Sequence, residues 1–425
     1  MKICKIISTF FFFCSITIFA QDHLDPGQNQ PTRQVHLDFH TSGLIPEIGK
    51  KFAKKQFQEM LVKGNINAIN IFAKGHHGWS YYPTSIGKMH PNLDFDLLGA
   101  QIEACHEIGV KCPIYFTVGW SHQDALAHPE WTERNKDGSM VGGQAIWGDP
   151  DSPKPYTEWT LLNPSGEYHQ QIMNQVEEIC KRYDVDGFWF DIYILSSGGY
   201  SINNLHRMRE MGMDMHDPAQ VERSNAELVK EHMKEIRQLI AGYHPDATVF
   251  FNGTTNLKRS VNVRHHLYQY NTHQDLEDLP TTWGGYNKLP LHTKYYIAHG
   301  WPVTAMSGKF HKAWGEFGGF KDAFSLTYEA SSMIAYGASC NFGDQLHPSG
   351  EMDPETYRLI GEAYKYVKQI EDYGPGATPV SKLGVWYTND HIADEGITNI
   401  LLDIHYDFLI AHAGNLDQFE RLIIP

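Results

Sequence analysis

One aspartate of this sequence, Asp191, directly follows a stretch that is typical of a buried strand. The residues from Phe188 to Phe190 are continuously apolar and come after Gly187, a pattern expected of a short strand buried on both faces in a parallel sheet. In a (β/α)8 barrel the carboxyl ends of the strands form the active site. We therefore predict that the Asp191 carboxylate takes part in chemistry, in preference to capping the next helix or pairing with a buried arginine.

A second carboxyl group would complete a pair able to cleave glycosidic bonds. In retaining glycoside hydrolysis, one carboxylate attacks the anomeric carbon while a protonated carboxyl about 5 to 5.5 Å away protonates the leaving oxygen. Asp191 is the natural nucleophile, because it ends a rigid strand among aromatic residues. Three acids follow later predicted strands and could be its partner: Glu277, Glu316 and Asp344. Each could equally be a loop acid bound by arginine or by backbone amides, so position alone leaves the choice open.

Histidines are frequent near the predicted strand ends. The set comprises His36, His40, His76, His77 and His122. Clustered imidazoles beside an aspartate could bind the metal ion of a hydrolase. However, His76 and His77 are adjacent and cannot both point inward from a regular strand. Hydrogen bonds to sugar hydroxyls demand less exact geometry, so we favour that role and predict neither a metal ion nor a cofactor. His36 could instead be a core histidine that its neighbours satisfy.

Aromatic residues of the predicted loops could add surfaces on which a sugar stacks. The C–H faces of a sugar ring pack against aromatic rings, although packing within a loop can also explain each of these residues. The predicted substrate-binding residues are His40, His76, His77, Trp79, Trp120, Trp283 and Trp314.

Eight strand-like segments alternate with helical segments over residues 35–374, which predicts one (β/α)8 TIM barrel. The predicted strands are 35–40, 66–74, 113–120, 188–191, 247–252, 266–271, 302–307 and 338–342. The predicted helices are 51–62, 93–108, 165–182, 218–242, 321–335 and 354–372. The long segment from the third strand to about residue 160 is rich in Pro, Gly, Trp and Asp, and we expect it to cover the pocket.

From residue 375 to 425 the pattern changes to a smaller α/β unit. A strand at 383–387, a helix at 399–411 and a strand at 421–424 indicate the opening of a flavodoxin-like, doubly wound domain. One βαβ unit cannot cover both faces of a parallel sheet, so we expect either a fragment or a segment that packs on the barrel. A complete domain here could join copies of the chain into a homo-oligomer.

The N-terminus has the pattern of a secretory signal peptide. Two lysines precede an apolar stretch from Ile6 to Phe19, and the small residue Ala20 follows. We predict a signal peptide over 1–20, a polar leader over 21–34, and a secreted or periplasmic protein. No later stretch is apolar for long enough to predict a membrane span.

The composition narrows the range of partners. The formal net charge is −15, which argues against binding to nucleic acid or to an anionic membrane surface. The 24 histidines and 13% aromatic residues suit a neutral, hydroxyl-rich ligand, such as an oligosaccharide or a glycoconjugate. The cysteine spacing beyond the signal peptide matches no zinc motif, so we expect buried free thiols at Cys105, Cys112, Cys180 and Cys340.

Three short segments carry a family resemblance. They are Lys74-Gly75-His76-His77-Gly78-Trp79, then Trp189-Phe190-Asp191, then Glu277 followed by Trp283-Gly284-Gly285-Tyr286. Together they resemble segments of the α-L-fucosidases of glycoside hydrolase family 29. The chain is also similar to the family 151 fucosidases, in which a β-galactosidase-type trimerisation domain follows the barrel. The resemblance implies Asp191 as nucleophile, Glu277 as acid/base, and contacts to sugar hydroxyls from His40, His76 and His77.

The residues and the resemblance together predict a secreted, exo-acting, retaining glycoside hydrolase, and specifically an α-L-fucosidase. Three alternatives stay open at this point. One is another exo-glycosidase on the same barrel, such as a galactosidase-like enzyme. The others are a metal-dependent hydrolase, which would lose activity on chelation, and a non-catalytic glycan-binding protein, which would bind sugar without turnover.

Overall fold

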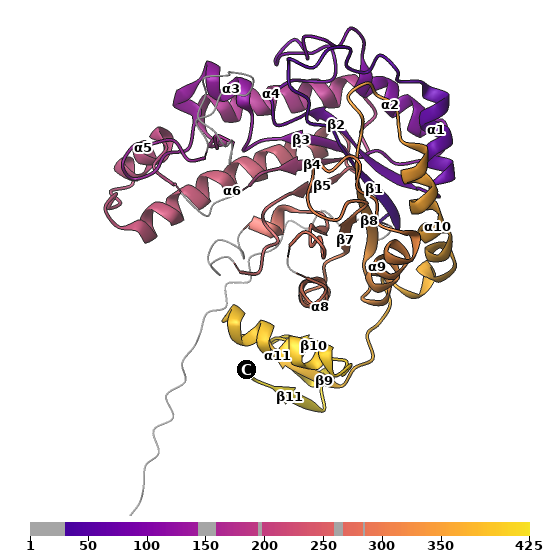
Figure 1. Ribbon diagram of the computed structural model, residues 1–425. Coiled ribbons are helices and arrows are strands. Elements are labelled where there is room, and N and C mark those ends of the chain that lie inside the picture. Colours follow the sequence, from indigo (N-terminus) through magenta and orange to yellow (C-terminus); the bar gives the residue numbers. More distant parts are fainter. Residues whose placement is uncertain (1–29, 143–158, 194–197, 259–266, 284) are drawn as a thin grey trace, which may run out of the picture.

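The structure is a computed structural model, and it describes residues 30–142, 159–193, 198–258, 267–283 and 285–425. The predicted signal peptide over 1–20 and most of the predicted leader lie outside the described residues. Within the described ranges, a barrel of strands surrounded by helices is followed by a small α/β unit (Figure 1). No helix in these ranges is both long and apolar enough to cross a lipid bilayer.

The barrel is one sheet of eight parallel strands, which confirms the predicted (β/α)8 fold. The order of strands in the sheet is β5-β4-β3-β2-β1-β8-β7-β6, so β1 pairs with both β2 and β8. All five residues of β4 are buried, as the apolar run before Asp191 predicted. The strands are β1 (Arg33–Asp38), β2 (Ala68–Lys74), β3 (Ile114–Thr117), β4 (Gly187–Asp191), β5 (Thr248–Phe251), β6 (Gln274–Leu276), β7 (Val303–Gly308) and β8 (Ser339–Gln345).

The ladder of strands is open between β5 and β6, at what we call the β5/β6 seam. Residues just before β6 bridge it. The Thr272 N–H donates to the Val249 carbonyl at 2.8 Å, and the Val249 N–H donates to the Thr272 hydroxyl oxygen at 2.9 Å. The Phe251 N–H donates to the Asn271 side-chain oxygen at 3.0 Å. One backbone hydrogen bond and two hydrogen bonds to side chains therefore join β5 to the residues before β6, where the ladder of strands is open.

Helices cover the outside of the barrel (Figure 1). The long helix before β4 illustrates the reason, because Ile172, Val176 and Ile179 recur every three or four residues and are all buried. The helices are α1 (Lys54–Lys63), α2 (Leu97–His106), α3 (His122–Ala127), α4 (Gly166–Arg182), α5 (Ile202–Glu210), α6 (Pro218–Tyr243), α8 (Lys288–Ala298), α9 (Ala323–Ala335) and α10 (Pro354–Ile370).

The sixth and eighth strands differ from their predicted positions. The sixth strand is β6, whereas the predicted segment 266–271 contains a 3-10 turn at Tyr268–Tyr270, and residue 266 lies outside the described ranges. The ring of Tyr268 packs against Tyr296 and Trp301, so the apolar character of this segment reflects a buried turn. The eighth strand extends to Gln345 and therefore includes Asp344.

The small C-terminal unit is a three-stranded parallel sheet in the order β10-β9-β11. Its strands are β9 (Leu383–Trp386), β10 (Leu409–Ala411) and β11 (Arg421–Ile423). The unit packs on α8, where the Lys294 ammonium donates to the Phe408 carbonyl at 2.8 Å. The His412 ring also contacts the Ala298 carbonyl at 2.9 Å, so the unit is attached to the barrel.

The predicted helix over 399–411 was wrong in its position. Helix α11 spans His391–Asp403, and its start is fixed by Asp390, whose side chain accepts hydrogen bonds from two backbone N–H groups of the first turn. The apolar residues at 409–411 belong to β10, the edge strand that continues the sheet.

Candidate active site

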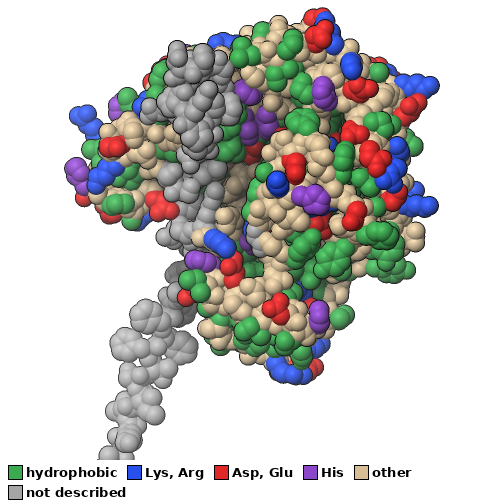
Figure 2. Space-filling model, viewed as in Figure 1, with side chains coloured by type: hydrophobic (Ala, Val, Ile, Leu, Met, Phe, Trp, Pro, Cys, Tyr) green, Lys and Arg blue, Asp and Glu red, His purple; other side chains and the backbone are tan. Residues whose placement is uncertain are grey.

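A cavity of about 750 Å³ opens at the carboxyl ends of the barrel strands. Histidine side chains gather at a hollow of the molecular surface (Figure 2). Every strand, or the loop that follows it, contributes to the cavity wall. One lining residue from each, in chain order, is Asp38, His76, Tyr115, Asp191, Asn252, Glu277, Met306 and Gln345. TIM barrels carry their active sites at this end.

Asp191 ends β4, and three donors bind its carboxylate. The Tyr115 hydroxyl donates to Oδ2 at 2.5 Å, while the Asn252 amide and the Ile192 backbone N–H each donate to Oδ1 at 2.8 Å. Burial raises the pKa of Asp191, and the hydrogen bonds oppose that rise because they stabilise the ionised form. The carboxylate is therefore held in one orientation at the cavity wall.

The residue after Asp191 has an unusual backbone conformation. Ile192 has a φ of 65°, a left-handed conformation that costs a β-branched residue about 1 to 3 kcal/mol. Gly119 makes room for it, because a Cβ atom at position 119 would lie 2.2 Å from the Ile192 carbonyl oxygen. The turn directs the Ile192 N–H back onto the Asp191 carboxylate, so the strain serves to orient this group.

Glu277 directly follows β6 and shares a hydrogen-bond donor with Asp191. The Trp314 indole N–H donates to Glu277 Oε1 at 2.8 Å, and the Asn252 amide donates to Oε2 at 3.0 Å. One Asn252 nitrogen thus bonds both carboxyl groups. Because its two N–H bonds diverge by roughly 120°, straight hydrogen bonds of 2.8 and 3.0 Å would place the two acceptor oxygens about 5 Å apart. This separation is close to that of a retaining carboxyl pair.

The two carboxyl groups differ in how strongly they hold a proton. Burial, together with the neighbouring Asp191 charge, raises the pKa of Glu277 to about 7. Asp191 accepts hydrogen bonds from three donors and Glu277 from two, so Asp191 ionises first. Near neutral pH the pair can therefore supply one carboxylate and one acid.

Two of the predicted histidines, His40 and His76, form a stacked pair in the cavity wall. Their ring centroids are 3.8 Å apart. His40 Nδ1 accepts a hydrogen bond from the His76 backbone N–H at 2.9 Å, and His40 Nε2 lies 2.8 Å from the Asp38 carboxylate. Both ring nitrogens of His40 thus contact protein groups, so His40 mainly fixes the positions of His76 and Asp38.

The hydrogen bonds around His76 assign its tautomer. The Thr117 hydroxyl donates to the Trp120 carbonyl at 2.5 Å, so its oxygen must accept from His76 Nδ1, 2.9 Å away. His76 Nε2 then carries a lone pair and lies 3.6 Å from Asp191 Oδ2. Burial holds the pKa of His76 well below its usual value, so the ring is neutral. Its Nε2 can accept a hydrogen bond from a ligand hydroxyl.

His77 and His36 also line the cavity. His76 and His77 lie in the turn after β2, not within the strand, so both can face the cavity although they are adjacent. This geometry differs from the one expected of a regular strand. His122 starts α3 and is not among the lining residues.

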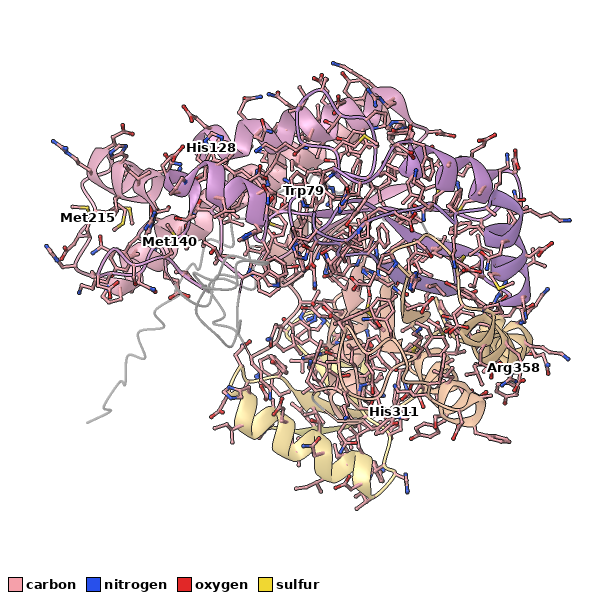
Figure 3. The ribbon with its side chains drawn as sticks, turned by 45° about the horizontal axis from the view of Figure 1, so that its top comes forward. Trp79, His128, Met140, Met215, His311 and Arg358 are labelled. Carbon is pink, nitrogen blue, oxygen red and sulfur yellow. The ribbon has the colours of Figure 1, made fainter. Side chains whose placement is uncertain are left out.

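Three of the four predicted tryptophans line the cavity, namely Trp120, Trp283 and Trp314. The Trp283 indole N–H also donates to the Glu277 carbonyl at 3.0 Å. The fourth, Trp79, lies on the loop after β2 (Figure 3) and is not among the lining residues. Its ring lies over Gly43 and at an angle to His90, so its contacts are with the loops around the site.

The other two acids considered as partners of Asp191 have different surroundings. Glu316 accepts hydrogen bonds from the backbone N–H groups of His311 and Lys312, both at 2.9 Å, and these lower its pKa. Asp344 is buried in β8 and pairs with the Lys309 ammonium at 2.9 Å. Neither lines the cavity, so among the three candidates Glu277 alone lies beside Asp191.

Sequence reasoning missed several polar residues of the site, above all Asn252, Tyr115 and Asp38. Asn252 comes directly after the apolar strand β5, which is the same signal that identified Asp191. Tyr115 lies inside the apolar strand β3, where nothing in the sequence distinguishes it from a core residue. Trp159 also lines the cavity, at the end of the segment predicted to cover the pocket, whose residues 143–158 lie outside the described ranges.

Comparison with solved structures shows which known proteins have a similar fold. The chain is similar to α-L-fucosidase isoenzyme 2 from Paenibacillus thiaminolyticus, with 36% identity and a TM-score of 0.85 over 93% of this chain and 60% of that chain. The resemblance to α-L-fucosidases is confirmed. A family model described as hypothetical glycosyl hydrolase 6 matches residues 53–192, a range that includes His76, His77 and Asp191.

Other α-L-fucosidase structures share less with this chain. A family 29 enzyme from Bacteroides thetaiotaomicron is 14% identical, with a TM-score of 0.49 over 76% of this chain and 61% of that chain. A comparison with curated protein sequences gave no match. The chain spans 60% of the length of the Paenibacillus α-L-fucosidase and 61% of the Bacteroides enzyme.

Proposed function

We propose that this chain is an exo-acting, retaining α-L-fucosidase that removes terminal fucose from glycans or glycoconjugates. One observation carries the proposal. The Asp191 and Glu277 carboxyl groups both accept hydrogen bonds from the single Asn252 amide, at 2.8 and 3.0 Å, in a cavity at the carboxyl end of a barrel similar to that of an α-L-fucosidase.

In the first step, the Asp191 carboxylate attacks the anomeric carbon of the sugar. The bond from that carbon to the leaving oxygen breaks, and Glu277 gives its proton to this oxygen. The raised pKa of Glu277, about 7, favours a carboxyl that is still protonated when substrate binds. In the second step Glu277, now ionised, accepts a proton from water while the water oxygen attacks the anomeric carbon and releases Asp191.

The cavity wall offers both kinds of contact that a deoxy sugar needs. His76 Nε2 can accept a hydrogen bond from a sugar hydroxyl, because the proton of this ring lies on Nδ1. Fucose carries a methyl group where most hexoses carry a hydroxymethyl group, and Met306, Phe317 and Leu346 supply apolar wall. This combination supports fucose over a galactoside, although both could use the same carboxyl pair.

The proposal is tested with a panel of aryl glycosides, with and without a metal chelator. We expect hydrolysis of the α-L-fucoside alone, unaffected by chelator. Asp191→Ala should abolish turnover. Glu277→Ala should reduce turnover by about 10²- to 10⁴-fold for poor leaving groups and by less for activated ones, because an activated leaving group needs little protonation.

Glu316→Ala is the matched control, since Glu316 follows a neighbouring strand but does not line the cavity. It should keep wild-type turnover. If Glu316→Ala lost activity while Glu277→Ala stayed active, the assignment of Glu277 as the acid would be refuted. A folded wild-type protein that binds fucose without turnover would instead indicate a glycan-binding protein.

We further propose that the protein is exported, with residues 1–20 removed. The support is the basic, apolar and small-residue order of its N-terminus. N-terminal sequencing of the protein recovered outside the cytoplasm should start at Gln21. Recovery of the intact N-terminus from the cytoplasm alone would contradict this.

A further inference from the structure

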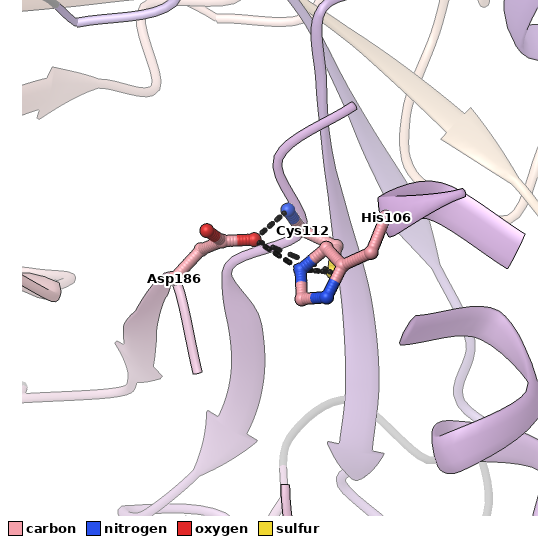
Figure 4. A group of neighbouring side chains, drawn as sticks. All are labelled: His106, Cys112 and Asp186. Carbon is pink, nitrogen blue, oxygen red and sulfur yellow. Dashed lines mark hydrogen bonds and ion pairs between the residues drawn. The ribbon is translucent and has the colours of Figure 1, made fainter. Parts of the chain in front are cut away.

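A second cluster of reactive side chains lies at the opposite end of the barrel from the cavity. His106 ends α2, Cys112 comes two residues before β3, and Asp186 directly precedes β4 (Figure 4). The strands are parallel, so residues that precede them lie at the amino end of the barrel. Among the described residues, this is the one group of three His, Cys, Asp or Glu side chains whose ligand atoms converge.

The three ligand atoms have nearly the spacing that a zinc ion requires. His106 Nε2 lies 3.5 Å from Cys112 Sγ, Cys112 Sγ lies 3.6 Å from Asp186 Oδ2, and Nε2 lies 2.8 Å from Oδ2. In a zinc tetrahedron the nitrogen–sulfur and sulfur–oxygen edges are both about 3.5 Å, and the nitrogen–oxygen edge is about 3.3 Å. Two edges therefore fit already, and the third must open by about 0.5 Å.

Neighbouring groups hold these ligands in place. Asp186 Oδ1 accepts from the Lys111 ammonium at 2.6 Å, which leaves Oδ2 directed toward His106 and Cys112. The Cys112 backbone N–H donates to Oδ2 at 2.9 Å. The exposed Asp184 carboxylate lies 4.0 Å from His106 Nδ1, on the side where metal-bound histidines usually meet a carboxylate.

We propose that His106, Cys112 and Asp186 bind a zinc ion. Zinc suits this mixed set of sulfur, nitrogen and oxygen ligands, and its binding releases the Cys112 thiol proton and the proton shared by His106 and Asp186 to solvent.

The zinc ion has a structural role at this position. It ties the end of α2 to the starts of β3 and β4, far from the candidate active site at the other end of the barrel. The side chain of His106 is 29% exposed, whereas that of Asp186 is 10% exposed, so an ion can enter from the histidine side. This inference does not rest on the proposed fucosidase activity.

The test uses the full chain, reduced with a thiol reductant and stripped with a chelator that is then removed. Titration with Zn²⁺ in a calorimeter should give about one equivalent bound per chain. Co²⁺ in place of Zn²⁺ should give the thiolate-to-metal absorption band that requires sulfur ligation. His106→Gln and Cys112→Ser should each weaken binding by at least ~10-fold.

Cys180→Ser is the matched control, because Cys180 is a buried free cysteine on α4 outside the cluster. It should keep wild-type affinity. His106→Gln replaces a partly exposed side chain and should stay folded by circular dichroism even if Cys112→Ser does not. Wild-type affinity no higher than that of His106→Gln would overturn the proposal. A disulfide at Cys112 in the non-reduced protein would overturn it as well.

Discussion

Replacing Asn252 by alanine is expected to disturb both carboxyl groups of the candidate active site at once. The amide of Asn252 donates to Asp191 at 2.8 Å and to Glu277 at 3.0 Å, and both hydrogen bonds lower the pKa of their acceptors. Removing the donor therefore raises both pKa values. The same change removes the group that sets the separation of the two carboxyls.

The size of the effect follows from the charge of the acceptor. A hydrogen bond to a charged group contributes about 1.5 to 3 kcal/mol, so losing the one to ionised Asp191 raises the pKa of that carboxyl, and the lost orientation of both carboxyls should lower kcat/KM by roughly 10- to 100-fold. Because 1.36 kcal/mol corresponds to one pH unit, the alkaline limb of the pH profile, set by Glu277 near 7, should move upward by about one unit. The acid limb, set by Asp191, moves in the same direction.

The assay is kcat/KM for an aryl α-L-fucoside, measured from acidic to alkaline pH for wild type and variant. Asn256→Ala is the matched control, because Asn256 lines the same cavity but its side-chain oxygen accepts from the Lys258 backbone N–H. The acid and alkaline limbs of the pH profile of Asn256→Ala should match those of the wild type. A tenfold loss in Asn252→Ala with both limbs unmoved would refute the electrostatic reasoning and leave positioning alone.

Two further substitutions test the surroundings of the site. Asp275 precedes Glu277 by two residues and accepts a hydrogen bond from the Trp189 indole N–H at 3.0 Å. Its charge raises the pKa of Glu277. Asp275→Asn should move the alkaline limb of the pH profile downward, opposite to Asn252→Ala; an upward shift would contradict this. Glu329 pairs with the buried Lys321 ammonium at 2.9 Å. Glu329→Gln should lower the free energy of unfolding in urea by about 3 to 5 kcal/mol by leaving a buried ammonium unpaired, and a loss below ~1 kcal/mol would contradict it.

The barrel and the position of Asp191 at a strand end could be predicted because they have strong local signals. β4 is buried on both faces, so its sequence is continuously apolar, and the carboxylate that ends it stands out. Helix α4 repeats its buried residues with helical spacing. Such patterns depend only on which face of an element is buried, and this can be read without knowledge of tertiary contacts.

The sixth strand could not be found by the same reasoning. β6 has three residues, and two of them are polar because they bind groups inside the protein. Gln274 accepts from the Asn271 side chain at 2.8 Å, and Asp275 accepts from Trp189. A strand whose buried side chains are polar, because they form hydrogen bonds inside the protein, lacks the hydrophobic pattern on which prediction depends.

The partner of Asp191 was likewise not decided by position. Glu277 and Glu316 both lie in loops after predicted strands, and Asp344 lies near another strand end. What separates them is hydrogen bonding over long sequence distances, such as that between Asn252 and Glu277, which no local pattern encodes. The start of α11 is a different case, since the capping residue Asp390 is a local signal that the predicted helix over 399–411 did not use.

Because of the β5/β6 seam, the separation of the Asp191 and Glu277 carboxyl groups depends on how far apart β5 and β6 lie. Asn252 follows the strand on one side of the seam and Glu277 follows the strand on the other. The hydrogen bond from Asn252 to Glu277 therefore joins the two sides of the seam, where no strand pairing holds β5 and β6 together. Small opening motions along this seam would change the carboxyl separation directly, while the other strands stay in register. Residues 271 and 272, which do not line the cavity, could thus tune the reaction by setting how far the barrel opens.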